Sequence, residues 1–195
     1  HLGALIIPIG YYFVIESQLQ TILILLPIAL ICIIIDSLRM QHQAVRKPFL
    51  QIFGHLLREQ EVNTLTGASY LLTSSMVTIA IFPKAIAFFA ISFLTVGDAF
   101  ASIIGMKWGK RKIFGTEKTL EGFLGFFVSC TIYGVIFYYS YFKNLYNSNP
   151  LNPLIIIIIG ALTAAVIEAV NLHINDNITI PILSGLAMSI LYVLI

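Results

Sequence analysis

The sequence has very little charge. Lysine, arginine, aspartate and glutamate together make up 10% of its 195 residues, whereas a soluble domain carries about 25%. Hydrophobic residues make up 58%, more than a soluble fold of this length could hide in a core. A soluble globular protein is therefore excluded, and membrane lipids are the expected surroundings of the chain. The net charge of +2 is too small to indicate nucleic acid as a partner.

Cysteine is almost absent. The chain has only Cys32 and Cys130, and each stands inside an apolar run without the spacing of a metal site. We interpret both as small packing residues rather than as partners in a disulfide. Low-complexity linkers and internal repeats are also missing, so we expect residues 1–195 to form one membrane-embedded domain. Because the sequence begins at His1 rather than at Met, we expect the natural chain to extend further at its N-terminus.

Long apolar runs, in contrast, are abundant. A membrane-spanning helix needs about 20 predominantly apolar residues, within a range of roughly 17–25. The hydropathy pattern predicts about seven such segments. The fold class is therefore predicted as all-α, a polytopic membrane bundle. The predicted spans are Leu2–Ile15, Leu19–Ile35, Thr66–Phe82, Ala85–Gly105, Leu120–Phe142, Leu154–Val170 and Ile178–Ile195.

The basic residues are distributed unevenly between the two sides of this bundle. Cytoplasmic loops of membrane proteins carry an excess of Lys and Arg. When the predicted spans alternate in direction, one side receives only Lys84 and Lys143. The other side is therefore predicted to be cytoplasmic. Its Lys and Arg residues are Arg39, Arg46, Lys47, Arg58, Lys107, Lys110, Arg111, Lys112 and Lys118.

The segment Asp36–Asn63, between the second and third predicted spans, has a different pattern. Apolar residues such as Phe49, Ile52 and Phe53 recur at helical spacing against polar ones. That periodicity predicts an amphipathic helix that lies in the membrane interface. Two interpretations remain open, a connector that rests on lipid headgroups and a gate for a substrate dissolved in the membrane.

The stretch 96–125 combines an acid inside a membrane span with a glycine-rich basic loop. Asp98 lies near the cytoplasmic end of its span, and a carboxylate at a helix centre costs about 2.5–3.5 kcal/mol on insertion scales unless it meets a cation, a metal or water. An ion pair with one of the lysines that follow is the structural alternative. Gly105, Gly109 and Gly115 come after it, and glycine lets a ligand approach the backbone closely.

The loop after Asp98 has the components of a polyphosphate site. Thr119 can cap the fifth span, so that the first N–H groups of this span face the loop. Amides, cations and a helix N-terminus together bind phosphate, although topology alone also requires basic loops. The Gly-x-x-x-x-Gly-Lys-Ser/Thr pattern of a Walker loop does not occur. The predicted nucleotide-binding residues of this stretch are Gly105, Lys107, Gly109, Lys110, Arg111, Lys112, Thr116, Lys118, Thr119 and Gly122.

Acidic residues accompany these bases, and topology gives no reason for them. Asp98, Glu117 and Glu121 stand among the cations, and carboxylates beside a phosphate site are the ligands that Mg²⁺ requires. Asp176 belongs to the same side of the membrane. We predict Asp98, Glu121 and Asp176 as Mg²⁺ ligands. Asp98 and Asp176 are also the predicted catalytic residues.

A second polar cluster follows the sixth predicted span. Glu168 is the only acid in that span, and Asn171 follows at i+3, so the two can share a helix face. Asp176 and Asn177 offer oxygen ligands on the cytoplasmic side, and a simple turn is the alternative interpretation. Asn177 completes the predicted nucleotide-binding residues, whereas His173 is interpreted as an interfacial histidine.

These motifs resemble a known family. The runs VGDAFASIIGMKWGK and GTEKTLEGFLG, with LTGASYLL and AAVIEAVNLHINDNITIPILSG, are similar to those of the CTP-dependent lipid kinases. This family comprises dolichol kinase, phytol kinase and fungal diacylglycerol kinase, with prokaryotic relatives. The similarity extends from His1 to about Gly185, and Asp-Asn-x-Thr-x-Pro at 176–181 is its most discriminating part. This family usually has an Arg-Lys pair just before the histidine that matches His1, and those positions lie before the start of the sequence.

The resemblance implies a reaction and a site. The reaction is transfer of the γ-phosphate of CTP to the hydroxyl of a membrane lipid alcohol, with Mg²⁺ as cofactor. The acceptor is a polyprenol or dolichol, a phytol-like alcohol, or diacylglycerol, and we expect an isoprenoid alcohol. The sequence has no signal for an oligomeric state. The positions that the resemblance places at the CTP site are Asp98, Gly105, Lys118, Thr119, Glu121, Gly122, Asp176 and Asn177.

Two other functions fit part of the pattern. Phosphatidate cytidylyltransferases also use CTP and share the Asp…Gly…Lys-Thr-x-Glu-Gly theme, but the Lys-Asp and His-Gly-Gly signature at their end does not occur here. An ion-coupled transporter would use Asp98 and Glu168 as an ion pathway. A transporter needs polar groups near the midplane and on both faces, whereas this chain keeps nearly all of them on one. A lipid kinase is therefore the preferred hypothesis.

Overall fold

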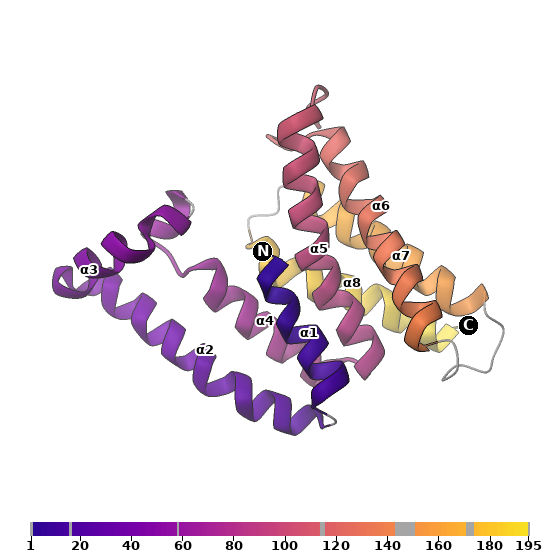
Figure 1. Ribbon diagram of the computed structural model, residues 1–195, viewed down its shortest axis with the longest axis horizontal. Helices are drawn as coiled ribbons and strands as arrows, with labels where there is room; N and C mark the ends of the chain where they lie inside the picture. The colour runs from indigo at the N-terminus through magenta and orange to yellow at the C-terminus, as the bar shows by residue number, and fades with distance from the viewer. Residues whose placement is uncertain are drawn as a thin grey trace.

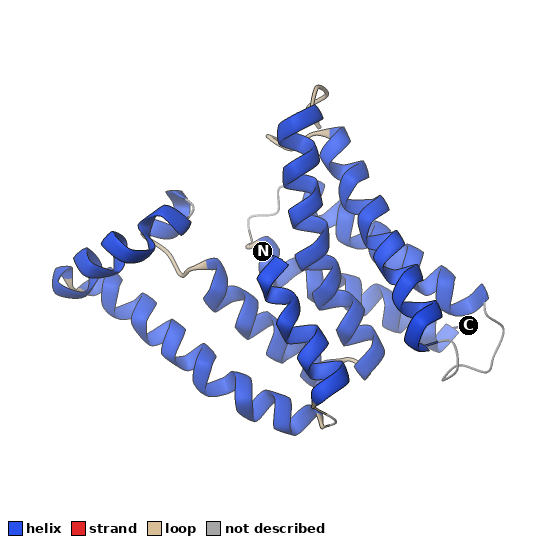
Figure 2. Ribbon diagram, in the orientation of Figure 1, coloured by secondary structure: helices blue, strands red, loops and turns tan. Residues whose placement is uncertain are grey.

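The computed structural model describes residues 2–15, 17–57, 59–113, 116–142, 151–170 and 174–194. Over these residues the chain is helical and contains no strand element (Figure 2), so the predicted all-α class is confirmed. The α-helices are α1 (Ile6–Ile9), α2 (Gln18–Gln41), α3 (Gln43–Phe53), α4 (Gly67–Ile81), α5 (Lys84–Trp108), α6 (Leu120–Phe137), α7 (Leu151–Ala169) and α8 (Asp176–Leu194). The 3₁₀ and π segments are η1 (Leu2–Leu5), η2 (Gly10–Val14), η3 (Gly54–Leu56), η4 (Glu59–Val62) and η5 (Tyr138–Phe142).

Every apolar segment that the sequence predicts as a span coincides with helix. Four of the described helices are long and apolar enough to cross a membrane, namely α2, α5, α8, and α6 with its π-helical extension to Tyr141. The segments Gly3–Val14, Gly67–Ile81 and Pro153–Ala169 are shorter apolar helices. The chain is therefore a membrane protein. The number of crossings and the cytoplasmic orientation stay predictions.

Helix α5 lies at the centre of the bundle (Figure 1). It contacts α1, α4, α6, α7 and α8. In its most apolar stretch 72% of the residues are buried, compared with 22% in α2 at the edge of the molecule. The side chains of Phe88, Ile91 and Phe93 are fully buried. Close packing against α6 depends on Gly97, because a Cβ there would come 2.3 Å from the ring of Phe126. The position of α5 thus determines where its neighbours lie.

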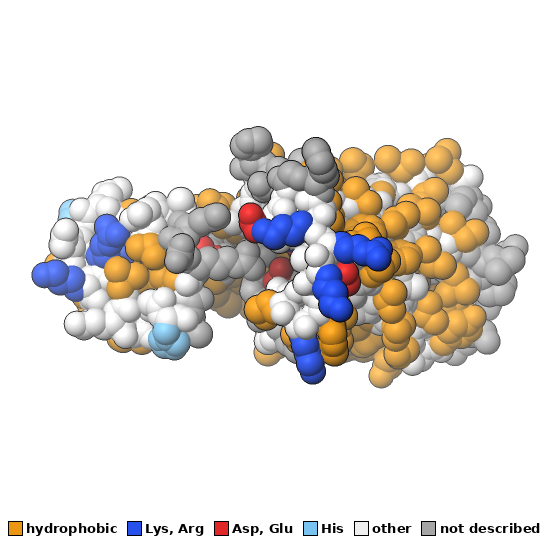
Figure 3. Space-filling model, turned by 90° about the horizontal axis from the view of Figure 1, so that it is seen from above, with side chains coloured by type: hydrophobic (Ala, Val, Ile, Leu, Met, Phe, Trp, Pro, Cys, Tyr) orange, Lys and Arg blue, Asp and Glu red, His pale blue; other side chains and the backbone are white. Residues whose placement is uncertain are grey.

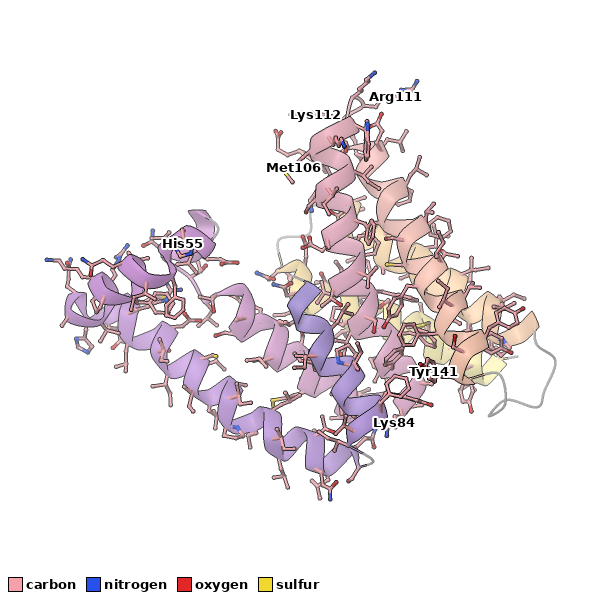
Figure 4. All side chains as sticks on the ribbon, viewed as in Figure 1. His55, Lys84, Met106, Arg111, Lys112 and Tyr141 are labelled. Atoms are coloured by element: carbon pink, nitrogen blue, oxygen red, sulfur yellow. The ribbon has the colours of Figure 1, made fainter. Side chains whose placement is uncertain are left out.

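The charged side chains gather at one end of the bundle. Figure 4 places Arg111 and Lys112 at the end where α5 meets α6, and Lys84 at the opposite end. Seen from above, Lys and Arg side chains surround the α5–α6 end with acidic side chains among them (Figure 3). Apolar side chains cover much of the flank beside them. This arrangement agrees with the one-sided charge distribution of the sequence.

The predicted amphipathic segment forms α3, which follows α2 at the edge of the molecule (Figure 1). The rings of Phe49 and Phe53 pack together on it, with centroids 5.2 Å apart. Its helical structure is confirmed, and its place in the membrane interface stays a prediction. The helix that contains the predicted span Leu19–Ile35 is longer than the span, because α2 continues to Gln41.

The extension of α2 contains a buried ion pair. Nε of Arg39 donates to Oδ1 of Asp36 at 2.8 Å, and neither side chain is more than 2% exposed. The other carboxylate oxygen accepts hydrogen bonds from the N–H and hydroxyl of Thr66, at 2.8 and 2.9 Å, and from the hydroxyl of Ser69 at 2.6 Å. Arg39 also donates to three backbone carbonyls of the connection before α4, at 2.8, 2.6 and 3.3 Å. These four residues, the α2–α4 clamp, fasten the two helices together and explain why α2 continues through two charged positions.

Replacing Asp36 by Ala should destabilise the protein strongly. The substitution leaves the guanidinium of Arg39 buried without its carboxylate, and removal of one partner of a buried ion pair costs about 3–5 kcal/mol. We expect a clear fall in the thermal unfolding midpoint of the detergent-solubilised protein. Ser37→Ala is the matched control, since its hydroxyl bonds back to Ile33 of the same helix at 2.8 Å, and it should change stability by no more than about 0.5 kcal/mol. Equal midpoints for the two variants would contradict the clamp.

Candidate functional site

The connection between α5 and α6 is a tight hairpin. The N–H of Leu120 donates to the carbonyl of Arg111 at 2.8 Å, and the N–H of Ile113 donates to the carbonyl of Lys118 at 2.9 Å. The two arms of the loop therefore run side by side, and the end of α5 lies next to the start of α6. Backbone hydrogen bonds therefore fix the two ends of the predicted phosphate-binding loop next to each other.

Helix α6 begins with the cap that the sequence predicts. The hydroxyl of Thr119 accepts a hydrogen bond from the N–H of Gly122 at 3.1 Å. The same hydroxyl lies 3.2 Å from where a Cβ on Gly105 would be, and a Cβ on Gly109 would come 2.2 Å from the carbonyl oxygen of Gly105. Close packing of α5 on α6 alone therefore accounts for these glycines. Their contact with a nucleotide stays a prediction.

Acidic side chains stabilise the outer part of the hairpin. Lys112 Nζ lies 2.5 Å from Glu117 Oε2, and both side chains are exposed. This hydrogen bond and the charge of Lys112 hold the pKa of Glu117 below its usual value. The carboxylate of Glu121 accepts hydrogen bonds from the N–H groups of Lys110 and Arg111, at 3.1 and 3.2 Å. Glu121 thus occupies backbone amides that the sequence attributes to phosphate binding, and its role as a metal ligand stays a prediction.

Lys118 points away from this outer part, towards acids on α7 and α8. Its ammonium group forms an ion pair with Glu168 and lies 3.7 Å from Oδ2 of Asp176. The Glu168 side chain is 5% exposed, whereas that of Asp176 is 30% exposed. A carboxylate in an apolar helix needs such a cation, so Lys118 explains how α7 accommodates Glu168. We call these three residues the Lys118 centre.

The sequence names Lys118 and Asp176 as site residues but leaves Glu168 out of the predicted site. The available signal was that Glu168 is the only acid in an apolar span, which points to a nearby cation or to function. A local pattern of residues cannot identify the partner of Glu168, because Lys118 lies 50 positions away.

A cavity of about 230 Å³ lies beside the Lys118 centre. It contains a cation, a threonine hydroxyl and the N-terminal end of α6, and this combination binds phosphate. We call it the α5–α6 cavity. Its charged lining residues are Glu117, Lys118 and Glu168, and its lining also includes Ser102, Gly105, Thr119 and Gly122.

Asp98 lies on α5 one turn before this cavity. The side chain is half-buried, and Ala101, Ser102 and Gly105, which line the cavity, follow it at i+3, i+4 and i+7. Residues at these intervals share one face of a helix. Asp98 therefore lies on the face of α5 that lines the cavity further along the helix, although it is not among the lining residues. Its chemical role stays a prediction.

The other predicted site residues lie elsewhere. Lys107 extends over the ring of Trp108, 4.7 Å from its centroid, on the exposed end of α5. The hydroxyl of Thr116 donates to a backbone carbonyl within the hairpin at 3.2 Å. Asn177 turns away from Lys118 towards α4, where its amide lies 3.4 Å from the carbonyl of Gly67. Gly115, Asn171 and His173 lie outside the described residues.

The predicted metal ligands do not form a closed cage by themselves. Among the residues that the structure describes, no three His, Cys, Asp or Glu side chains are grouped to hold a metal ion. Mg²⁺ is usually held by one or two carboxylates and by the phosphates of its nucleotide, rather than by a cage of protein ligands. The half-exposed carboxylate of Asp176, beside the α5–α6 cavity, has the chemistry for such a shared ion.

Comparison with known proteins relates the chain to enzymes that use CTP. An uncharacterized protein of Rickettsia prowazekii is 30% identical over 187 residues, which cover 93% of this chain and 86% of that protein. CTP-dependent diacylglycerol kinase 1 of Schizosaccharomyces pombe is 28% identical over 156 residues, or 77% of this chain and 71% of the kinase. Dolichol kinase of Saccharomyces cerevisiae is 39% identical over 88 residues, or 45% of this chain and 16% of that protein. No solved structure gives a significant match.

The similarity to relatives that are named as lipid kinases confirms the resemblance to CTP-dependent lipid kinases. The family match is broader still, because the model described as the cytidylyltransferase family matches residues 2–194, nearly the whole chain. On this match, the chain belongs to the cytidylyltransferase family.

Proposed function

We propose that this chain is a CTP-dependent lipid kinase, which transfers the γ-phosphate of CTP to the hydroxyl of a membrane lipid alcohol. The observation that carries the proposal is the Lys118 centre, where one cation and two acids meet beside a phosphate-sized cavity at the polar end of a membrane bundle. Relatives named as a CTP-dependent diacylglycerol kinase and a dolichol kinase support this donor and this class of acceptor.

Phosphoryl transfer requires mainly positioning and neutralisation of charge. In the proposed complex, the γ-phosphate lies in the α5–α6 cavity, where Lys118 and the N-terminus of α6 offset its negative charge. Exposed cations of the hairpin, such as Lys110 and Arg111, attract the rest of the nucleotide. Glu168 is a positioning residue, because its ion pair holds the ammonium group of Lys118 at the cavity.

The reaction forms one phosphorus–oxygen bond and breaks another. The alcohol oxygen attacks the γ-phosphorus, the bond to the β–γ bridging oxygen breaks, and CDP leaves with that electron pair. The proton of the alcohol moves to a carboxylate, for which Asp98 and Asp176 are the candidates. Mg²⁺, when bound, supplies further neutralisation of the phosphates, and Asp98, Glu121 and Asp176 are its proposed ligands.

A cytidylyltransferase reaction is the second candidate, because the matching family carries that description. In that reaction a lipid phosphate attacks the α-phosphorus of CTP, and pyrophosphate leaves. The kinase is preferred because the characterised relatives reported above are kinases by name. The two reactions differ in their products, so one assay separates them.

We further propose that the site opens on the cytoplasmic side. The basic residues at the α5–α6 end support this orientation, because cytoplasmic loops carry an excess of Lys and Arg. CTP is a cytoplasmic nucleotide and cannot cross the bilayer unaided, which also favours a site on that side.

Purified protein in mixed micelles should transfer label from γ-labelled CTP to a lipid alcohol. Diacylglycerol, dolichol and phytol form the acceptor panel, and γ-labelled ATP is the comparison donor. Phosphatidate with α-labelled CTP tests for the cytidylyltransferase reaction. We expect a labelled lipid phosphate and unlabelled CDP, and we expect EDTA to stop the reaction. A CDP-lipid formed with release of pyrophosphate would establish the cytidylyltransferase instead. Failure of every nucleotide to label any lipid would overturn the kinase.

Replacing Asp98 by Asn should nearly abolish turnover without unfolding the protein. The substitution keeps the shape and removes the charge, and loss of a general base reduces the rate by about 10²–10⁴-fold. Thr131→Val is the control, since Thr131 does not line the α5–α6 cavity and its hydroxyl donates back to the carbonyl of Phe127 in its own helix at 2.8 Å, so this variant should keep nearly full activity. Gel filtration and circular dichroism would confirm that both variants are folded. Unchanged turnover in Asp98→Asn would place the catalytic centre elsewhere.

The two lysines of the hairpin should differ sharply in importance. Lys118→Met should reduce kcat/KM for CTP by about 10²-fold, the scale of losing one group that stabilises transition-state charge. Lys112→Met removes the same charge from an exposed ion pair, and such pairs contribute little. This variant should therefore leave kcat/KM for CTP within about fivefold of the unmodified protein.

Lys118→Met also leaves Glu168 buried without its partner, so its loss of activity needs a stability control. The double variant Lys118→Met/Glu168→Gln removes both charges and should regain most of the thermal midpoint while remaining inactive. Equal loss of activity in Lys118→Met and Lys112→Met would show that the α5–α6 cavity is not the phosphate site.

A further inference from the structure

A second and larger cavity, of about 570 Å³, lies between α2, α3, α4, α5 and the start of α8. Its volume falls within the range of about 300–1,000 Å³ that is usual for small-molecule sites. We call it the α2–α4 cavity. Much of its wall is apolar, and includes Cys32, Ile35, Phe49, Phe53, Leu71 and Leu94.

The polar groups of the α2–α4 cavity gather near the start of α4. A Cβ on Gly67 would lie 3.0 Å from Oε1 of Glu61 and 3.1 Å from Nδ2 of Asn177. Thr66 and Asp36 of the clamp line the cavity there as well. The cavity therefore has an apolar body and a hydrogen-bonding end, which is the polarity of a lipid with a small polar head.

Two helices connect this cavity to the α5–α6 cavity. On α5, Thr95 lines the larger cavity and Gly105 lines the smaller one, and Asp98 lies on the same face between them. Thr95 precedes Asp98 by three residues, a rise of about 4.5 Å along the helix. At the start of α8, Asp176 lies near Lys118 and the next residue, Asn177, lines the larger cavity. Groups in the two cavities can therefore meet at Asp98 and at the N-terminus of α8.

The charge of the lining separates the two cavities. The described lining of the α2–α4 cavity includes the carboxylates of Asp36 and Glu61 and contains no Lys or Arg. The guanidinium of Arg39 is engaged behind Asp36 by the clamp. Such a lining disfavours a triphosphate or an anionic lipid and accommodates a neutral molecule that carries a hydroxyl. The α5–α6 cavity, in contrast, is lined by the cation of Lys118 as well as by the acids Glu117 and Glu168.

We propose that the α2–α4 cavity binds the acceptor, a neutral lipid alcohol that enters sideways from the membrane and presents its hydroxyl between Asn177 and Asp98. This inference rests on the proposed kinase function. Helix α3 belongs to the site, because Phe49 and Phe53 line the cavity and the guanidinium of Arg39 lies 4.8 Å from the ring centroid of Phe49. For this amphipathic helix the sequence left two interpretations open, a connector and a substrate gate. In this proposal the helix is part of the wall of the substrate cavity.

Two alanines of α4 provide a matched test of turnover. Ala68 and Ala80 are both exposed on α4, but only Ala68 lines the cavity. Ala68→Phe should fill the cavity and raise KM for dioctanoylglycerol by about tenfold or more, while KM for CTP stays within about twofold. Ala80→Phe should change neither constant. Equal KM values for the lipid in both variants would overturn the assignment.

The cysteines provide a test that needs no turnover. Cys32 lines the cavity, whereas Cys130 is fully buried in the core. An uncharged maleimide should modify Cys32, and dioctanoylglycerol without CTP should slow this modification about tenfold when the site is mostly occupied. Dioctanoyl phosphatidate, which has the same chains and an anionic head, should protect much less. Cys32→Ser confirms which thiol reacts.

The possible outcomes test the lipid-binding role of the α2–α4 cavity and the kinase reaction separately. Protection of Cys32 by the alcohol, without any phosphate transfer from CTP, would support the lipid cavity and overturn the kinase. Phosphate transfer without protection, and with an unchanged KM in Ala68→Phe, would overturn the cavity and leave the kinase in place. Equal protection by dioctanoylglycerol and dioctanoyl phosphatidate would overturn the preference for a neutral acceptor.

Discussion

The arrangement of the candidate site depends on the neutralisation of one buried carboxylate. Glu168 lies in an apolar helix, and its charge is tolerated because the ammonium group of Lys118 forms an ion pair with it. The pair ties the hairpin between α5 and α6 to α7, and the proximity of Asp176 adds α8. As a result, the only inward-pointing lysine seen in the described part of the hairpin lies beside the N-terminus of α6. The environment that we propose for phosphate thus follows from the need to neutralise a carboxylate inside an apolar helix.

The α2–α4 clamp also neutralises a buried carboxylate, that of Asp36, but there protein groups satisfy the charge. Asp36 and Arg39 are buried, and both Asp36 oxygens accept hydrogen bonds from protein groups. A buried pair satisfied in this way stabilises a particular packing of helices and has no need of a ligand. The Lys118 centre is more open, because Asp176 is partly exposed and a cavity adjoins the lysine. The difference in solvent access, rather than in residue types, distinguishes this structural ion pair from the one that we propose to be functional.

The two cavities divide the proposed reaction between different environments. The small cavity holds a cation and suits a polyanion, whereas the large one is mostly apolar and suits a lipid. Asp98 and the start of α8 lie where the two environments meet. A lipid alcohol carries its hydroxyl at the membrane surface, so a kinase for such a substrate needs its reacting groups at the polar end of the bundle. The positions of the described charged residues fulfil that requirement (Figure 3).

The sequence by itself determined the class of the protein, its helices and many of the residues that the structure brings together at the candidate site. Low charge and apolar periodicity require a helical membrane bundle, and Thr119 specifies the start of α6 through contacts within one helical turn. Such features are local, so they can be recognised without knowing how helices pack. Asp98, Lys118 and Asp176 were recognisable because charge in or beside an apolar span is costly.

Only the tertiary structure decided which of these groups meet. Lys118 pairs with Glu168 across 50 positions, Asp36 is satisfied by the start of α4, and Asn177 faces another cavity than its neighbour Asp176. Each outcome depends on which helices lie side by side around α5. That packing is set by contacts between distant segments, which a local pattern of residues does not contain.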